Sequence, residues 1–147
     1  MTAELKKGFD NMKHIQTIEN LYEKAQERYE KSERLYEHEG GRIGEAVLNG
    51  RMSHYFGHKG ELEEKYSVTI MDVEGKTRLY LRHWGTTTLT VEIDTKKLLQ
   101  FYGESVSDRD SMNTMLNLLD IPGGFRYFPS TDDFVYEVDN ERYYSKV

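Results

Sequence analysis

The chain has 147 residues, of which 37% are hydrophobic and 31% are charged, and it carries a formal net charge of −6. This length suits one sizeable core, so we expect residues 1–147 to form a single domain. The sequence contains no cysteine, which excludes disulfides, thiolate zinc sites and cysteine nucleophiles. The acidic balance argues against broad affinity for DNA or anionic membranes and favours a basic partner or simple solubility.

The sequence gives no sign of membrane insertion or secretion. No apolar run approaches the roughly 18 residues that a membrane helix requires. Segment 1–7 lacks the apolar core of a secretory signal. We therefore expect a cytoplasmic protein without a membrane partner.

One long helix is predicted from Asp10 to Glu39, ending at Gly40 and Gly41. Apolar or small residues recur at alternating spacings of three and four, as in a coiled-coil seam. They are Ile15, Ile18, Tyr22, Ala25, Tyr29, Ser32 and Tyr36. At 1.5 Å per residue the helix would measure about 45 Å, longer than a small sheet can cover. We expect part of it to project, to form a homodimer or to contact a partner; the alternative is packing along its own sheet.

Residues 42–64 are predicted to form a loop with at most one helical turn, because four glycines interrupt every pattern. His54 and His58 have the spacing of helical metal ligands. Gly57 separates them and no glutamate follows His54. We expect solvated histidines, no metal site and no cofactor.

An antiparallel sheet is predicted from residue 65 to residue 140. The period changes to two at Lys65, and turn-forming residues separate successive apolar runs. The expected strands include Thr77 to Trp84, Leu98 to Tyr102, Phe125 to Phe128 and Phe134 to Val138. Residues 142–147 are expected to form a loose tail.

A second helix is predicted over residues 108–119. Ser107 and Asp110 form a capping-box pattern at its start. An apolar face at i, i+3, i+4 and i+7 follows, made by Met112, Met115, Leu116 and Leu119. The whole chain is thus expected to be α+β, with a long N-terminal helix followed by an antiparallel sheet of four to six strands and one helix packed on a face.

One predicted strand carries a basic and aromatic face. Its alternate positions hold Arg78, Tyr80, Arg82 and Trp84, which would form a ladder about 14 Å long. Such a ladder can stack bases and pair phosphates, as in a nucleic-acid-binding module. It can equally receive the acidic first helix of the same chain.

Carboxylates concentrate in the first helix and near the end of the chain. Candidate partner-binding residues are Glu23, Glu27 and Glu30 in the helix, with Asp132 and Asp133 in the last hairpin. Carboxylates spaced along a rigid scaffold can imitate a phosphate backbone and occupy a nucleic-acid channel. The alternative is a solvated face.

Ser105 lies between a predicted strand and a predicted helix, as the serine of a nucleophile elbow does. The glycine that should follow two residues later is Ser107, and the predicted sheet is antiparallel. A small serine hydrolase at Ser105 is therefore a lesser alternative to a helix cap at Ser105 or Ser107, and no catalytic residue is expected.

Residues 84–119 resemble small orphan proteins of phages that infect Gram-positive bacteria. The likeness rests on Trp84-Gly-Thr-Thr-Thr-Leu89, on residues 101–105, and on residues 107–110 with Asn113. It covers about a quarter of the chain. Such phage proteins often inhibit host defence, anti-CRISPR proteins among them, and those inhibitors are commonly acidic and non-catalytic.

The resemblance implies an inhibitory binding protein that acts in the cytoplasm of an infected bacterium. Its expected partner is a host defence effector, such as a CRISPR nuclease, whose nucleic-acid-binding surface it would occlude. A nucleic-acid partner, bound by the Arg/Tyr/Trp face, is the second choice.

Overall fold

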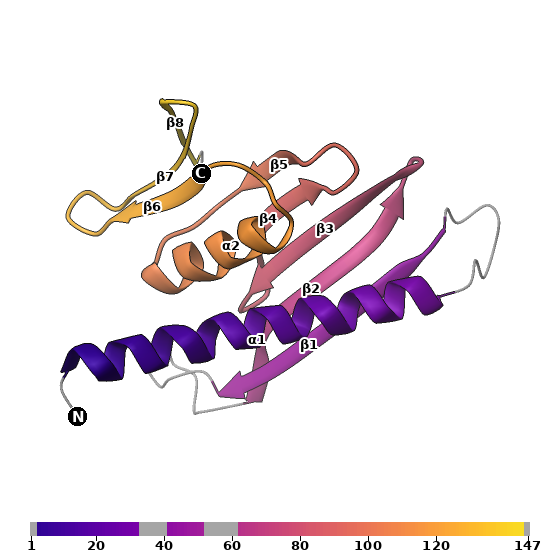
Figure 1. Ribbon diagram of the computed structural model, residues 1–147, viewed down its shortest axis with the longest axis horizontal. Coiled ribbons are helices and arrows are strands. Elements are labelled where there is room, and N and C mark those ends of the chain that lie inside the picture. Colours follow the sequence, from indigo (N-terminus) through magenta and orange to yellow (C-terminus); the bar gives the residue numbers. More distant parts are fainter. Residues whose placement is uncertain (1–2, 33–40, 52–61, 146–147) are drawn as a thin grey trace. The chain divides into compact units, whose positions relative to one another are not determined.

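The computed structural model describes residues 3–32, 41–51 and 62–145, with side chains from Ile15 onward in the first range. Contacts divide the chain into two compact units. One comprises Met1–Asn20 and Gly103–Val147, and the other comprises Leu21–Tyr102. Helices and antiparallel sheets make up the described residues (Figure 1), so the predicted α+β class is confirmed.

The first helix, α1 (Ala3–Lys31), begins and ends earlier than predicted. Its end at Lys31 corrects the predicted boundary at Glu39, and residues 33–40 lie outside the described part of the chain. The Ser32 hydroxyl donates to the Tyr29 carbonyl and accepts from the Ile43 N–H, so it joins the end of α1 to the next strand. The predicted seam is partly right: Ile18 and Ala25 are buried, but Ile15 is 41% exposed.

A five-stranded antiparallel sheet forms the rest of the Leu21–Tyr102 unit, with its strands in chain order. They are β1 (Ile43–Arg51), β2 (Leu62–Val73), β3 (Lys76–His83), β4 (Thr86–Glu92) and β5 (Lys97–Phe101). The central position in this order belongs to β3.

The strand β1 corrects the prediction of a loop in this region. The glycines of β1 interrupt the alternation of apolar and polar residues that predicts a strand. Gly44, however, is needed where β1 packs against α1. A Cβ at Gly44 would lie 2.2 Å from the Ala25 carbonyl oxygen and 2.2 Å from the Tyr29 nitrogen. The backbones of α1 and β1 therefore approach more closely than any side chain would permit. Tertiary contact, which a local pattern does not reveal, determines this strand.

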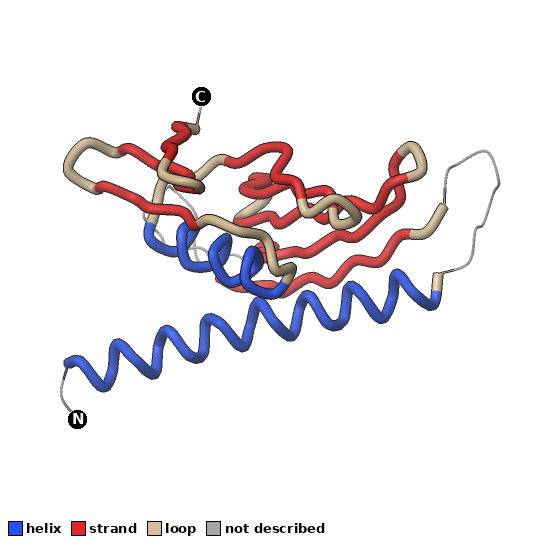
Figure 2. The backbone as a smooth tube through the Cα atoms, turned by 45° about the horizontal axis from the view of Figure 1, so that its top comes forward, coloured by secondary structure: helices blue, strands red, loops and turns tan. Residues whose placement is uncertain are grey.

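The part of α1 from residue 21 to residue 31 runs beside β1 (Figure 2), and the side chains of Arg28 and Ser32 contact the backbone of the β1 edge. The Arg28 guanidinium donates to the Glu45 carbonyl over 2.6 Å, and Ser32 accepts from Ile43 N–H over 3.1 Å. Exposed edge groups are templates for pairing with another strand. These two contacts protect the first half of the β1 edge.

One face of the five-stranded sheet faces α1. Tyr29 of α1 donates a hydrogen bond to Asp72 of β2, which places the even-numbered β2 side chains on the helix side. Val68 and Ile70 share that face and lie opposite Leu81 and Leu79. Together with Leu21, Ala25, Leu89 and Val91 these side chains are buried and form the apolar core of the unit.

The Gly103–Val147 segment contains a helix and a three-stranded antiparallel sheet. They are α2 (Val106–Leu118), β6 (Gly124–Phe128), β7 (Asp133–Val138) and β8 (Glu141–Tyr144). The strand β8 corrects the predicted loose tail: Tyr143 pairs with Tyr136, and Arg142 pairs with Glu137. The predicted apolar face of α2 is buried, with Met112, Met115 and Leu116 at 0–1% exposure.

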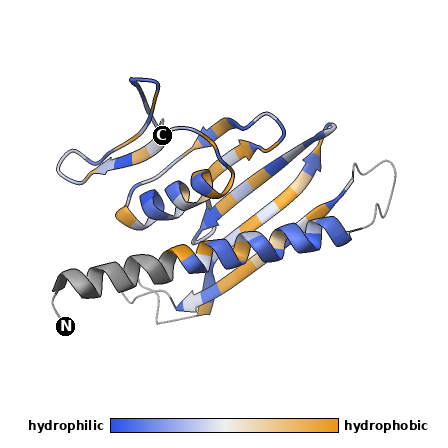
Figure 3. Cartoon of the chain, viewed as in Figure 1, coloured by the Kyte–Doolittle hydropathy of each residue, from blue (hydrophilic) through white to orange (hydrophobic). Residues whose placement is uncertain are grey.

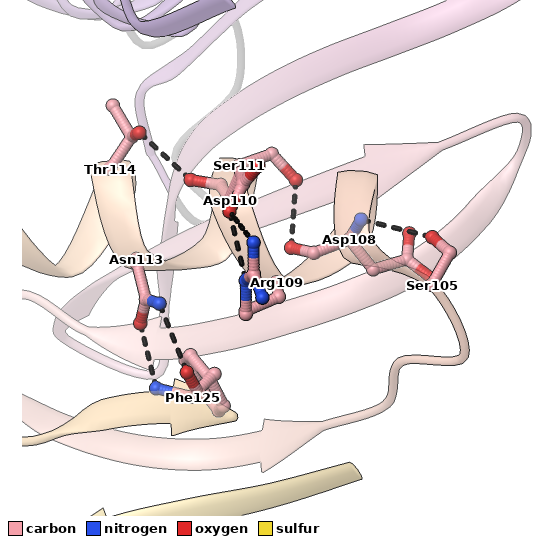
Figure 4. Close-up of polar contacts among 8 residues, drawn as sticks. All are labelled: Ser105, Asp108, Arg109, Asp110, Ser111, Asn113, Thr114 and Phe125. Carbon is pink, nitrogen blue, oxygen red and sulfur yellow. Dashed lines mark hydrogen bonds and ion pairs between the residues drawn. The ribbon is translucent and has the colours of Figure 1, made fainter. Parts of the chain in front are cut away.

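The Asn113 side chain fastens α2 to β6 (Figure 4). Its amide nitrogen donates to the Phe125 carbonyl over 3.1 Å, and its amide oxygen accepts from the Phe125 N–H over 2.7 Å. Because one amide satisfies both backbone groups, Asn113 pairs with β6 as a neighbouring strand would.

Neither described helix has the length and apolar character that crossing a membrane requires.

Candidate binding surfaces

The predicted acidic surface of α1 is largely neutralised by its own cations. The C-terminal half of α1 is coloured mostly as hydrophilic in Figure 3. Exposed Glu23, Glu27 and Glu30 alternate with exposed Lys24, Arg28 and Lys31. Glu27 forms an ion pair with Lys31 at 2.6 Å, and the hydrogen bond from Lys31 lowers the pKa of Glu27. This face does not present an unbroken row of negative charge.

The net negative charge lies instead in the C-terminal third. Residues 103–147 contain nine carboxylates and four Lys or Arg side chains, a net charge of −5. Residues 1–102 contain 17 carboxylates and 16 Lys or Arg side chains, a net charge of −1. The two parts together give the net charge of −6 of the whole chain. Nearly all of the charge that a basic partner could recognise therefore belongs to this segment.

Turns of the three-stranded sheet hold several of these carboxylates. Asp132 lies in the β6–β7 turn at φ 57°, and Asp139 lies in the β7–β8 turn at φ 52°. Aspartate and asparagine tolerate this left-handed conformation better than most residues. The turn geometry therefore accounts for aspartate at both positions, and both carboxylates are exposed.

Asp132 belongs to an acidic cluster around Tyr127. The Tyr127 hydroxyl donates to Asp132 over 2.9 Å. The pKa of Tyr127 is raised, and this hydrogen bond is the largest cause. Burial and the negative charges of Asp132, Glu104 and Asp108 raise it further. Carboxylates of both the β6–β7 turn and the start of α2 therefore act on the Tyr127 hydroxyl. Asp133, at the first position of β7, is half-buried.

The outer face of the three-stranded sheet contains a local exception to this negative charge. The Arg126 and Arg142 guanidiniums lie 5.0 Å and 5.3 Å from the centre of the Phe128 ring. Both form ion pairs with Glu137, at 3.2 Å and 3.5 Å. One carboxylate bridging two cations stiffens the sheet, although exposed ion pairs contribute little stability.

The predicted Arg/Tyr/Trp ladder does not form as a row of four. Arg78, Tyr80 and Arg82 lie on the sheet face away from α1, because the intervening Leu79 and Leu81 are buried beneath the helix side. Trp84 follows the last residue of β3 and has φ 50°, so strand alternation has ended before it. Its ring stacks near His83, at 6.0 Å between centroids.

The His83 ring in turn stacks on Tyr66, with centroids 4.3 Å apart and planes inclined by 5°. Tyr66 is 2% exposed and lies on the same face as Val68. Trp84 therefore joins an aromatic stack with His83 and Tyr66 instead of extending the arginine row.

Ser105, and not Ser107, caps α2, which corrects the sequence-based assignment (Figure 4). The Ser105 hydroxyl accepts from the Asp108 N–H over 3.1 Å, and the Asp108 carboxylate accepts from the Glu104 N–H over 3.0 Å. The true capping pair is shifted by two residues because the helix begins at Val106. Ser105 has extended backbone angles, φ −153° and ψ 165°, and segment 103–147 contains no histidine.

The possible metal ligands His54 and His58 lie outside the described residues. Among the residues that the structure does describe, no group of three or more His, Asp or Glu side chains could hold a metal ion.

Two polar side chains were missed by the sequence reasoning. Ser67 is 1% exposed, and its hydroxyl has no hydrogen-bond partner among the described residues. Asn113 pairs with Phe125 as described above. For Ser67, the sequence gives only the weak signal of a polar residue at a half-buried strand position. For Asn113, no local sequence pattern predicts the pairing with Phe125.

No family model, no curated protein and no solved structure matches the chain.

Proposed function

We propose that this chain is a non-catalytic binding protein that occludes a basic, nucleic-acid-binding surface of another protein. The observation that supports the proposal is the net charge of −5 on residues 103–147, against −1 on the rest of the chain. Electrostatic complementarity of this kind speeds association and disfavours partners of like charge. A basic channel that normally holds phosphates is a matching partner.

The scaffold around these carboxylates suits recognition of a fixed charge pattern. The short strands β6, β7 and β8 connect through tight turns, and Asn113 fastens β6 to α2. Carboxylates on ordered turns lose little conformational entropy on binding, so more of their interaction energy becomes affinity. Asp132 and Asp139 are the turn carboxylates that we assign to the partner surface.

The identity of the partner follows from the sequence resemblance to phage orphan proteins. On that basis we propose a phage-type inhibitor, acting in the cytoplasm of an infected bacterium on a host defence effector such as a CRISPR nuclease. No catalytic residue is assigned, since the cap contacts account for Ser105.

The test is affinity capture from a nuclease-treated lysate of a Gram-positive bacterium. The variant Asp132→Asn, Asp133→Asn and Asp139→Asn removes three charges, and asparagine tolerates left-handed backbone. The matched control Glu23→Gln, Glu27→Gln and Glu30→Gln removes three charges from α1. We expect the hairpin variant to weaken capture by about tenfold, on the basis of about 0.5 kcal/mol per exposed charge.

The helix control should retain its partner, and capture by the wild type should weaken as salt rises. If the helix control alone lost capture, the partner surface would lie on α1. Capture that neither variant nor salt affects would contradict recognition by charge.

A further inference from the structure

The middle strand of the five-stranded sheet has long polar side chains on the face away from α1. In the order β1-β2-β3-β4-β5 the middle strand is β3, which presents Arg78, Tyr80 and Arg82 on this face. Within the described part of the Leu21–Tyr102 unit, α1 covers the opposite face, through its contacts with Gly44 and Asp72. These three long polar side chains, called the ridge below, lie along the middle of the face.

Short hydroxyl side chains flank this ridge on both sides. Thr69 of β2 and Thr90 of β4 lie directly opposite Tyr80, and Ser67 lies opposite Arg82. All three are at most 8% exposed. Thr69 donates to Glu45 and Thr90 donates to Gln100, so their hydroxyls are satisfied.

Ser67 differs from these neighbours because its buried hydroxyl has no hydrogen-bond partner in the part of the chain that the structure describes. A buried hydroxyl without a partner carries an unmet desolvation cost, and native structures contain few such groups. Its cross-strand neighbours are Val47 on β1 and Arg82 on β3. Val47 is 41% exposed, so an accessible apolar group and a guanidinium adjoin the unsatisfied hydroxyl.

The two arginines of the ridge are not equivalent. Arg78 is half-buried, and its Nε has no hydrogen-bond partner among the described residues. Tyr80 and the negative charge of Glu92 raise the pKa of Arg78. Arg82 is exposed, donates to Thr87 over a long 3.4 Å, and forms no ion pair with any described carboxylate. Of the two arginines, Arg82 is therefore the more available to an external anion.

We propose that this face binds single-stranded nucleic acid, with Arg82 at a phosphate and Tyr80 beneath a base. Guanidinium groups pair with phosphates, and aromatic rings on open sheets stack bases without sequence preference. Val47 supplies an apolar contact for a sugar or base beside the phosphate. An acidic peptide would use Arg82 but would gain little from the Tyr80 ring.

This site lies in Leu21–Tyr102, whereas the proposed partner surface lies in residues 103–147, so either proposal can fail without the other. The test is fluorescence anisotropy of a labelled oligo(dT) of about 12 nucleotides with the full chain at physiological salt. We expect micromolar binding. Arg82→Ala should weaken it about tenfold and reduce the magnitude of the salt slope by about 0.7, the value for one phosphate contact on a single strand.

Tyr80→Leu should weaken binding at least about fivefold through lost stacking. Lys24→Ala removes an exposed cation from α1 and should have no effect. Circular dichroism establishes whether each variant is folded; Arg82 is exposed, so its variant remains informative if the Tyr80 variant unfolds.

The proposal is overturned if oligo(dT) does not bind at about 100 μM, or if Arg82→Ala binds as the wild type does. A labelled poly-glutamate peptide serves as the second ligand. Equal, Arg82-dependent affinity for that peptide would make the face a site for acidic proteins and would also overturn the proposal.

Discussion

At the scale of single residues, the cap of α2 lies at Ser105, whereas the capping-box pattern of the sequence points to Ser107. Ser105 satisfies the Asp108 N–H, whereas Ser107 is an exposed helical residue. Ser105→Ala should lower the free energy of unfolding by about 1 kcal/mol, the usual cost of losing an N-cap. Ser107→Ala should change it by less than about 0.5 kcal/mol. Urea denaturation of both variants measures the difference, and the reverse order would disprove the cap assignment.

Asp72 connects α1 to the sheet through a carboxylate that accepts three hydrogen bonds. Burial raises its pKa, but hydrogen bonds from Tyr29, the Arg42 N–H and Thr77 outweigh burial and leave the pKa below its ordinary value of 3.8. A carboxyl with a lowered folded-state pKa stabilises the fold above its unfolded-state pKa, and the contribution is lost as pH falls through the folded-state value.

Asp72→Asn should therefore cost about 1 kcal/mol at neutral pH, a discounted value for a partly exposed group. The difference from the wild type should shrink as pH falls from about 5 towards 3. Urea denaturation across this range checks the trend, and a difference that grew on acidification would refute it.

At the scale of elements, Gly44 sets the approach of α1 to β1. Gly44→Ala places a Cβ against backbone atoms of α1, and we expect a loss of about 2–3 kcal/mol from overpacking. Gly50→Ala is the matched control, because the nearest atom there, 3.0 Å away, belongs to the flexible Lys65 side chain. Thermal unfolding compares the two variants. Equal stability would mean that α1 does not pack on β1 as described.

The predicted homodimer through α1 is tested by sedimentation. Ile18 and Ala25 of the predicted seam are fully buried within one chain, and Tyr29 is bonded to Asp72. Little of the seam remains for a second copy, so we expect a monomer at all micromolar concentrations. A sedimentation coefficient that increases with concentration would support the dimer instead.

Elements with strong local signals were predictable from the sequence, and those that depend on tertiary contact were not. The apolar spacing of Met112, Met115 and Leu116 identifies α2, and alternation identifies β2 to β4. By contrast, β1 exists because of its pairing with β2 and the helix at Gly44. Trp84 itself has a left-handed backbone conformation, so the alternation of the strand ends before it. Residue spacing alone does not reveal that Trp84 is separated from Arg78 and Arg82.

At the scale of the whole molecule, charge is distributed unevenly along the chain. The acidic residues 103–147 support binding to a basic protein, and the Arg82 face of Leu21–Tyr102 supports binding to nucleic acid. The α1 carboxylates that the sequence also suggested are balanced by neighbouring cations. We propose that the acidic segment takes the place of nucleic acid on its partner.

Competition on the captured partner tests that claim most directly. The partner's affinity for a labelled DNA duplex is measured at increasing concentrations of this protein carrying Arg82→Ala, so that the chain's own proposed oligonucleotide site cannot contribute. We predict mutual exclusion: the apparent Kd for the duplex should rise linearly with the protein concentration. The variant with Asp132, Asp133 and Asp139 changed to Asn should compete about tenfold less well. A ternary complex in which the partner binds the duplex with unchanged affinity would contradict it.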